Sequence, residues 1–177
     1  MIFYHVISDA PKAAGQRLLL DEAHPNGVYR RVSAQMKIVK AIFACPEAYH
    51  GRQLSHEVKV ALRELALERV RKQSYPRYPS RLAALYVSST MEEAQRWAVY
   101  FAGLGRPVYG VARIKADGNC FIGDASKCFD GTVEESQNLK MAEIYWHNAP
   151  HPDGREPIPE ILVDGEILIE DIIPFRA

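Results

Sequence analysis

One segment, residues 82–114, constrains the fold of this 177-residue chain more than any other. It opens with an apolar run, Leu82 to Ser88, whose length and composition are typical of a central strand. Thr90 and Glu93 then have the spacing of a capping box, in which each side chain satisfies the backbone N–H of the other residue. A helix should therefore begin directly after the strand. Two glycines end that helix, and the next apolar run, residues 107–114, predicts another strand.

Further helix and strand signals flank this segment on both sides. We expect a strand at residues 2–8, a helix at 33–43 and a helix at 55–72 capped by Ser55. A second capping box, from Thr132 to Glu135, should open another helix. The chain should close with a hairpin of two strands, 160–163 and 166–169, that turns at Asp164 and Gly165. Residues 12–50 also permit strands in place of the helix. Helices and strands in this arrangement predict an α+β domain rather than a parallel βαβ array.

Length and composition agree with a single domain over residues 1–177. The mass of 20.0 kDa and a hydrophobic content of 47% suit one ordinary core. The sequence has no Gly-x-Gly-x-x-Gly pattern and no Walker loop, so the common nucleotide-binding folds lose their main support. Its three cysteines, Cys45, Cys120 and Cys128, are too widely spaced for a zinc site and predict free thiols and no metal.

Charge and hydropathy exclude several classes of partner. The 22 basic and 22 acidic residues cancel, so no overall field attracts nucleic acid or an anionic membrane. No apolar run is long enough to span a bilayer, and the first residues lack the features of a cleavable signal. We expect the mature chain to start at Met1 and to be cytoplasmic, or exported without a cleavable signal peptide. The oligomeric state is left open.

A set of motifs in a fixed order resembles a known superfamily. These motifs are Tyr4-His5 near the N-terminus, the run from Ser80 to Ser89 followed by a Glu-Glu-Ala helix containing Trp97, and Glu160-Ile161-Leu162-Val163 before a glycine turn. In this order they resemble the ADP-ribosyltransferase superfamily of the His-Tyr-Glu type, and more narrowly a small bacterial family of uncharacterised domains placed in it. The resemblance implies split antiparallel sheets around a cleft that holds NAD, with flanking helices. It also implies a mono-ADP-ribosyltransferase, in the manner of a bacterial toxin or effector, that modifies a macromolecular acceptor such as a protein or nucleic acid.

The same resemblance assigns cofactor-binding roles to five residues. His5 corresponds to the histidine that binds the adenosine ribose, and Tyr86 to the aromatic residue that stacks on the nicotinamide. Ser88 shares a strand face with Tyr86, whereas Ser89 points away, so Ser88 is the better candidate for the cleft. Arg81 is a candidate for clamping the pyrophosphate. Tyr4 completes the set.

Glu160 is the expected catalytic residue. Cleavage between nicotinamide and ribose passes through an oxocarbenium-like transition state, which a nearby carboxylate stabilises. Glu166 and Glu170, on the expected partner strand of the hairpin, remain alternatives for this role. Ile158 stands where arginine-modifying members of the superfamily carry Glu or Gln, which argues against arginine as the acceptor.

Other interpretations of the function remain open. With water as the acceptor, the same residues would make an NAD glycohydrolase, and a catalytically silent binding module would keep only the fold. A basic cluster at residues 68–72 with Arg77 and Tyr78 suggests an RNA-targeting toxin, although a solvated helix end is the more ordinary interpretation. We expect Trp97 and Trp146 to pack in the core, and we leave the role of His147 open.

Overall fold

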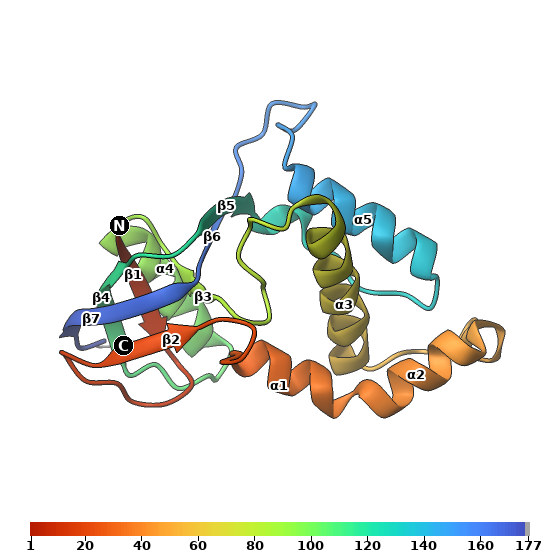
Figure 1. Ribbon diagram of the computed structural model, residues 1–177, viewed down its shortest axis with the longest axis horizontal. Coiled ribbons are helices and arrows are strands. Elements are labelled where there is room, and N and C mark those ends of the chain that lie inside the picture. The colour runs from red at the N-terminus through yellow and green to blue at the C-terminus, as the bar shows by residue number, and fades with distance from the viewer. Residues whose placement is uncertain (176–177) are drawn as a thin grey trace.

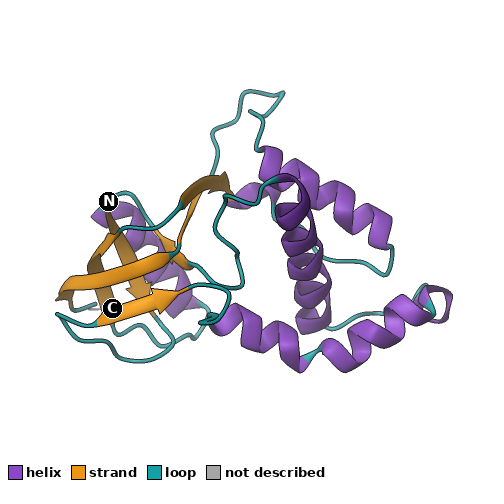
Figure 2. Ribbon diagram, viewed as in Figure 1, coloured by secondary structure: helices purple, strands orange, loops and turns teal. Residues whose placement is uncertain are grey.

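The computed structural model describes residues 1–175 and has the predicted α+β class, with two antiparallel sheets (Figures 1 and 2). The four-stranded sheet contains, in spatial order, β1 (Ile2–Ile7), β4 (Gly110–Ala116), β7 (Gly165–Ile173) and β2 (Arg17–Leu20). The three-stranded sheet contains β3 (Leu85–Val87), β6 (Pro159–Val163) and β5 (Cys120–Asp124). The helices are α1 (Gly27–Ala34), α2 (Met36–Ala44), α3 (His56–Ser74), α4 (Met91–Gly103) and α5 (Glu135–His147), with two short 3-10 helices at Pro46–Tyr49 and Ala125–Lys127.

The predicted closing hairpin is wrong, because β6 and β7 belong to different sheets. β6 pairs with β3 and β5, whereas β7 pairs with β4 and β2. The chain therefore passes from one sheet to the other between β6 and β7, as it also does between β4 and β5. These two connections bind each other through hydrogen bonds from Asn119 N to Asp164 Oδ1 (2.7 Å) and from Glu166 N to Asp117 Oδ1 (3.0 Å). A Cβ on Gly118 would come within 2.3 Å of the Asp164 carbonyl oxygen, so glycine permits this close approach. The sequence did indicate a turn at Asp164 and Gly165. The path of the chain through that turn depends on residues 117–119, which are distant in the sequence.

Each face of the three-stranded sheet packs against a different part of the molecule. Ile161 and Val163 of β6 point into the core between the two sheets. Leu162 points the other way and packs with residues of α3 and α5. Because strand side chains alternate, Glu160 shares the face of Leu162 and is directed toward the helices.

The helices form two groups around the sheets (Figure 1). α4 packs on β1 and β4 through Ala94 and Ala98, which are fully buried. The other four helices lie together, with α1 and α2 packed on α3, and α3 packed on α5. Figure 2 shows this separation of the strands and α4 from the remaining helices. No helix in residues 1–175 is both long and apolar enough to cross a membrane.

Helix capping agrees with the sequence in two places and differs in a third. Ser55 caps α3, and the capping box of Thr90 and Glu93 opens α4 as predicted. The second capping box does not form. Thr132 instead exchanges hydrogen bonds with the buried side chain of Asn138, so α5 begins only after Glu134.

Several other boundaries differ from the prediction. The helix expected at residues 33–43 is two helices, and the first begins at Gly27, with Asn26 as its cap. The expected strand at 82–88 is only three residues long. The strand expected at 107–114 lies at Gly110–Ala116, and both β2 and β5 were not anticipated.

Candidate functional site

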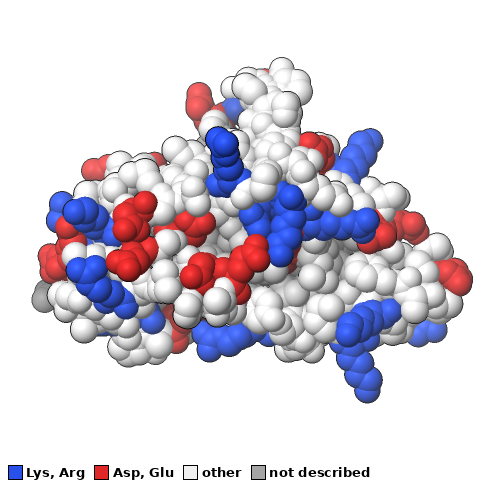
Figure 3. Space-filling view, viewed as in Figure 1, with Lys and Arg blue, Asp and Glu red and all other residues white. Residues whose placement is uncertain are grey.

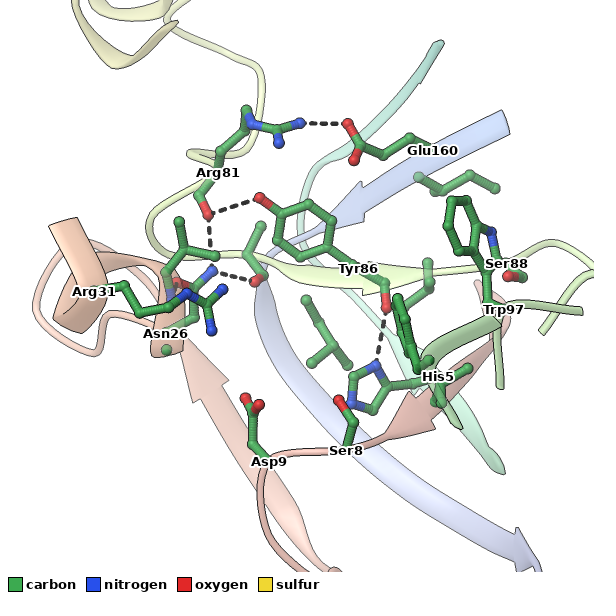
Figure 4. A pocket seen from close by; sticks show the side chains of 18 of the residues that line it. His5, Ser8, Asp9, Asn26, Arg31, Arg81, Tyr86, Ser88, Trp97 and Glu160 are labelled. Carbon is green, nitrogen blue, oxygen red and sulfur yellow. Dashed lines mark hydrogen bonds and ion pairs between the residues drawn. The ribbon is translucent and has the colours of Figure 1, made fainter. Parts of the chain in front are cut away.

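A cavity of about 320 Å³ lies where the two sheets meet the helices. Its volume is at the lower end of the range for small-molecule sites. Residues from β1, β3, β6, α1, α3 and α4 line it, so its walls come from both groups of helices (Figure 4). Five of the six predicted site residues line this one cavity: His5, Arg81, Tyr86, Ser88 and Glu160.

His5 is held in one tautomer by the neighbouring strand. Its Nδ1 donates a hydrogen bond to the Tyr86 carbonyl oxygen at 2.9 Å, which joins β1 to β3. Burial lowers the pKa of His5 below its usual 6.5, although this hydrogen bond and the charge of Asp9 oppose the shift. The ring is therefore neutral at pH 7, and its Nε2 is a hydrogen-bond acceptor. Figure 4 shows this nitrogen on the side of Ser8 and Asp9.

Tyr86 of β3 and Ser88, which follows that strand, both line the cavity. The Tyr86 hydroxyl donates to the Arg81 carbonyl oxygen at 3.3 Å, and the Arg81 guanidinium lies 5.3 Å from the centre of the Tyr86 ring. Burial raises the pKa of Tyr86 well above its usual value, so its hydroxyl stays protonated. Ser89 is turned away from the cavity, and its hydroxyl donates to Glu93 in the cap of α4.

The Glu160 carboxylate is fixed through one of its two oxygens. Oε1 accepts hydrogen bonds from Arg81 Nη1 and from the Tyr145 hydroxyl, the latter at 2.6 Å. Among residues 1–175 no donor is bonded to Oε2, and the side chain keeps 15% of its surface exposed. One carboxylate oxygen is thus anchored to the protein and the other is available to a ligand.

Glu64 and Arg63 extend this arrangement into α3, and neither was predicted from the sequence. Glu64 is only 1% exposed and accepts from Arg81 Nε (2.8 Å) and Nη2 (3.2 Å), and from Arg63 Nε (3.0 Å). Burial alone would raise the pKa of Glu64, but the two arginines lower it below its usual value, so the residue is ionised. One signal was available, because Glu64 interrupts the apolar face of α3 between Leu62 and Leu67, where an acid needs a buried partner.

Arg81 has partners other than those expected from the sequence. Its guanidinium is buried and bonded to Glu64, Glu160 and the Tyr145 hydroxyl (2.7 Å). Although burial opposes protonation, the two carboxylates raise the pKa of Arg81 well above its usual value. These bonds use four of the five N–H donors of the guanidinium, which leaves one Nη2 proton for the predicted pyrophosphate contact.

Two exposed arginines at the cavity mouth are better placed to meet an anion. Arg31 of α1 and Arg106, after α4, line the cavity and are exposed to solvent. Arg106 donates to the Ser8 hydroxyl at 2.9 Å and lies 3.9 Å from Asp9. Neither arginine was identified from the sequence, because exposed arginines carry no distinguishing local pattern.

Several other predicted residues lie outside the cavity. Tyr4 packs on the α4 side of β1, because strand alternation turns it away from His5. Glu166 and Glu170 belong to β7 and pair with Arg17 (3.5 Å) and Arg113 (2.5 Å), so neither alternative acid lines the cavity.

Both tryptophans pack in hydrophobic clusters, whereas His147 is exposed. Trp146 is in the core, as predicted, and its Nε1 donates to the Leu67 carbonyl oxygen at 2.8 Å. Trp97 packs with the buried residues beneath α4 but also lines the cavity, which the prediction of a core residue did not include. His147 is exposed and does not line it.

The basic cluster at residues 68–72 is balanced by acids. Arg69 pairs with Glu135 at 2.6 Å, and Arg71 is buried and pairs with Glu68 at 2.7 Å. Figure 3 shows acidic side chains among the basic ones on the face in view. The charges of Arg69 and Arg71 are thus balanced within the protein.

No group of three or more potential metal ligands occurs in the described part of the chain. The three cysteines are free thiols. The cavity presents a half-anchored carboxylate, a neutral imidazole, aromatic surfaces and arginines.

Comparison with known proteins gives a family without an assigned activity. No curated protein matches the chain. A family model described as "Protein of unknown function (DUF2441)" matches residues 3–175. Because this match covers nearly the whole sequence, the chain belongs to the DUF2441 family.

Proposed function

We propose that the protein binds NAD in the cavity and transfers its ADP-ribose to a macromolecular acceptor, with release of nicotinamide. The observation that carries this proposal is the convergence of His5, Tyr86 and Glu160 on one cavity between two antiparallel sheets. These residues come from three separate strands, and each presents the chemistry that its role requires. The likeness to the His-Tyr-Glu ADP-ribosyltransferases in order and strand context supports the same conclusion.

The dinucleotide would lie along the cavity from β1 to β6. The neutral Nε2 of His5 would accept a hydrogen bond from a hydroxyl of the adenosine ribose. Arg31 and Arg106 at the mouth would face the pyrophosphate. The nicotinamide would lie at the β3 end against the aromatic ring of Tyr86, with Ser88 beside it.

Glu160 would supply the electrostatic contribution to catalysis. The bond between the nicotinamide nitrogen and ribose C1′ breaks, and its electron pair neutralises the pyridinium. The acceptor then bonds to C1′ and loses a proton. Positive charge develops on the ribose in the transition state, so a carboxylate bound to the 2′-hydroxyl through Oε2 stabilises the transition state more than the bound substrate.

A second cavity offers the acceptor an approach to Glu160. It has a volume of about 250 Å³ and is lined by Trp97, Tyr100 and Ile158, among others. Trp97 and Pro159 line both cavities, and Pro159 immediately precedes Glu160. Glu93 and Arg96 add charged groups to its wall, and an acceptor resting there would reach the sugar carbon from the side of β6.

The test compares Glu160→Gln with Glu166→Gln. Binding is measured by calorimetry with NAD, and turnover by nicotinamide release in the presence of labelled NAD and cell lysate. We expect Glu160→Gln to bind NAD but to lose turnover by about 10²–10³-fold, as when other preorganised electrostatic groups are removed. Glu166→Gln is the matched control, because its side chain is exposed and lies outside the cavity.

The fate of the labelled ADP-ribose distinguishes transfer from hydrolysis. Label bound to macromolecules supports transfer, whereas free ADP-ribose as the sole product would indicate hydrolysis instead. No binding of NAD by the wild type, or full turnover by Glu160→Gln, would reject the proposal.

A further inference from the structure

The Glu160 carboxylate is oriented by a charged network that reaches from β6 to α3. We propose that Arg81 and Tyr145 are positioning residues for Glu160, and that Glu64 holds Arg81 in the orientation this requires. The inference rests on the proposed function for its effect on turnover, but its structural part concerns Glu160 alone.

The Arg81 side chain bridges Glu64 and Glu160, and Figure 4 shows its contact with Glu160. Its Nε and Nη2 bond the two oxygens of Glu64, at 2.8 and 3.2 Å. Its Nη1 is left to bond Glu160 and Tyr145. Because the guanidinium is planar and rigid, fixing one edge on Glu64 fixes the direction in which Nη1 points.

Tyr145 supplies the second donor to the same oxygen. Its hydroxyl accepts from Arg81 Nη1 at 2.7 Å and donates to Glu160 Oε1 at 2.6 Å, which closes a three-membered ring of hydrogen bonds. The Tyr145 ring is fully buried and packs edge-on against Trp146, with centroids 4.9 Å apart. Burial raises the pKa of Tyr145 well above its usual value, so the hydroxyl remains a donor.

Both donors act on Oε1, which determines the direction of Oε2. A carboxylate held by one oxygen alone can still turn about its terminal bond, but two donors from different directions restrict that rotation. Oε2 is then directed to the side where the described protein offers it no partner. Such prior orientation reduces the reorganisation needed when charge develops on the substrate.

Removing these charged groups from water costs free energy, and a role in orienting Glu160 would explain why the protein keeps them. The network buries Glu64 and Arg81, and leaves the side chains of Glu160 and Arg63 only 15% and 17% exposed. Buried ion pairs of this kind are often no more stabilising than apolar side chains of similar volume. Their location beside the cavity, rather than elsewhere in the core, points to a role in holding Glu160.

The test is Tyr145→Phe, with Tyr75→Phe as the matched control. Phenylalanine keeps the buried ring and removes one donor to Glu160. Tyr75 also donates to a glutamate, Glu143, at 2.7 Å, but outside the cavity. Turnover is expressed per NAD-binding site, with the number of sites measured by calorimetry.

For Tyr145→Phe we expect NAD affinity and KM close to wild type and a kcat per site lower by roughly 10- to 100-fold, as for other residues that orient a reacting group. Tyr75→Phe should change neither. A loss of binding sites with unchanged turnover per remaining site would mean that Tyr145 is merely structural, and would overturn the inference. Unchanged turnover would overturn it as well.

Crystal structures of the ligand-free proteins decide the structural part independently of NAD. We expect the Glu160 carboxylate to be rotated or to occupy more than one orientation in Tyr145→Phe, and to be unchanged in Tyr75→Phe. An unchanged carboxylate in Tyr145→Phe would reject positioning. If the wild type proves unable to cleave NAD, the proposed function fails, and these structures still decide whether Tyr145 positions Glu160.

Discussion

At the scale of single residues, His5 illustrates how a neighbour determines the chemistry of a side chain. The Tyr86 carbonyl accepts from Nδ1, and burial lowers the pKa of the ring, so Nε2 is an acceptor at neutral pH. The order of His5, Tyr86 and Glu160 along the chain could be recognised from the sequence. The tautomer could not, because it depends on the contact between β1 and β3.

On the proposed function, NAD binding should depend on pH through His5. Because the folded pKa lies below 6.5, affinity should be constant above pH 6.5 and should weaken as the pH falls through the folded value, when Nε2 gains a proton. Loss of one hydrogen bond predicts about a 3- to 10-fold weaker affinity, measured by calorimetry. His5→Gln should bind more weakly without this pH dependence. His147→Gln, an exposed control, should retain it, and a wild-type profile in His5→Gln would contradict the assignment.

His5 also makes the free energy of unfolding depend on pH. An unfolded His5 takes up its proton near pH 6.5, before the folded one does. His5 therefore lowers the free energy of unfolding as the pH falls below 6.5, and has no such effect above it.

At the scale of elements, Asn26 ties α1 to the loop that carries Arg81. Its Oδ1 caps the helix by accepting from Val28 N (2.8 Å) and Tyr29 N (3.2 Å). Its Nδ2 donates to the carbonyl oxygens of Arg81 (2.8 Å) and Ala84 (2.7 Å). The contact with residues 81–84 could not be predicted from the sequence, because it joins segments far apart in the chain.

Asn26→Ala should destabilise the protein by about 2–4 kcal/mol, from the lost cap and two carbonyl oxygens deprived of a donor. The free energy of unfolding in urea measures this effect. Asn119→Ala is the control, because Asn119 is exposed and its side chain makes one long hydrogen bond, 3.4 Å to Asp164. The control should change stability by less than about 0.5 kcal/mol. Equal effects from the two variants would show that Asn26 does not join these elements.

At the scale of the whole molecule, Asp124 holds the long loop before β6 against β5. It is 1% exposed and accepts hydrogen bonds from Ser126 N (2.9 Å), Ile158 N (3.0 Å) and His151 Nε2 (2.5 Å). Burial alone would raise the pKa of Asp124, but hydrogen bonding from the Ser126 side chain and from these donors lowers it to about 2. The chain entering Glu160 is therefore anchored by a carboxylate that stays ionised at moderately acid pH.

The free energy of unfolding at acid pH should depend on the Asp124 carboxylate. The folded pKa is about 2 against an ordinary 3.8, so Asp124 stabilises the fold above about pH 4 and loses this effect as the pH falls toward 2. Asp124→Asn should cost about 2 kcal/mol at pH 7, and the difference from wild type should shrink at pH 2. Urea unfolding across this range measures the change.

The control for this variant is Asp153→Asn, in the same loop but exposed. It should leave the pH dependence unchanged. A constant difference between Asp124→Asn and the wild type from pH 7 to pH 2 would contradict the assignment to the Asp124 carboxylate.

Local patterns along the chain were enough to identify the α+β class, the caps of α3 and α4, and the strand that contains His5. These features depend on contacts between residues close in sequence, whose spacing can be read directly. The separation of β6 from β7, the failed cap at Thr132 and the burial of Glu64 became apparent only in the folded molecule. Each depends on a partner contributed by a distant segment: Asn119 beside Asp164, Asn138 beside Thr132, and Arg81 beside Glu64. Backbone and charged groups that leave water must find such partners in three dimensions, and the local sequence does not say which ones they will be.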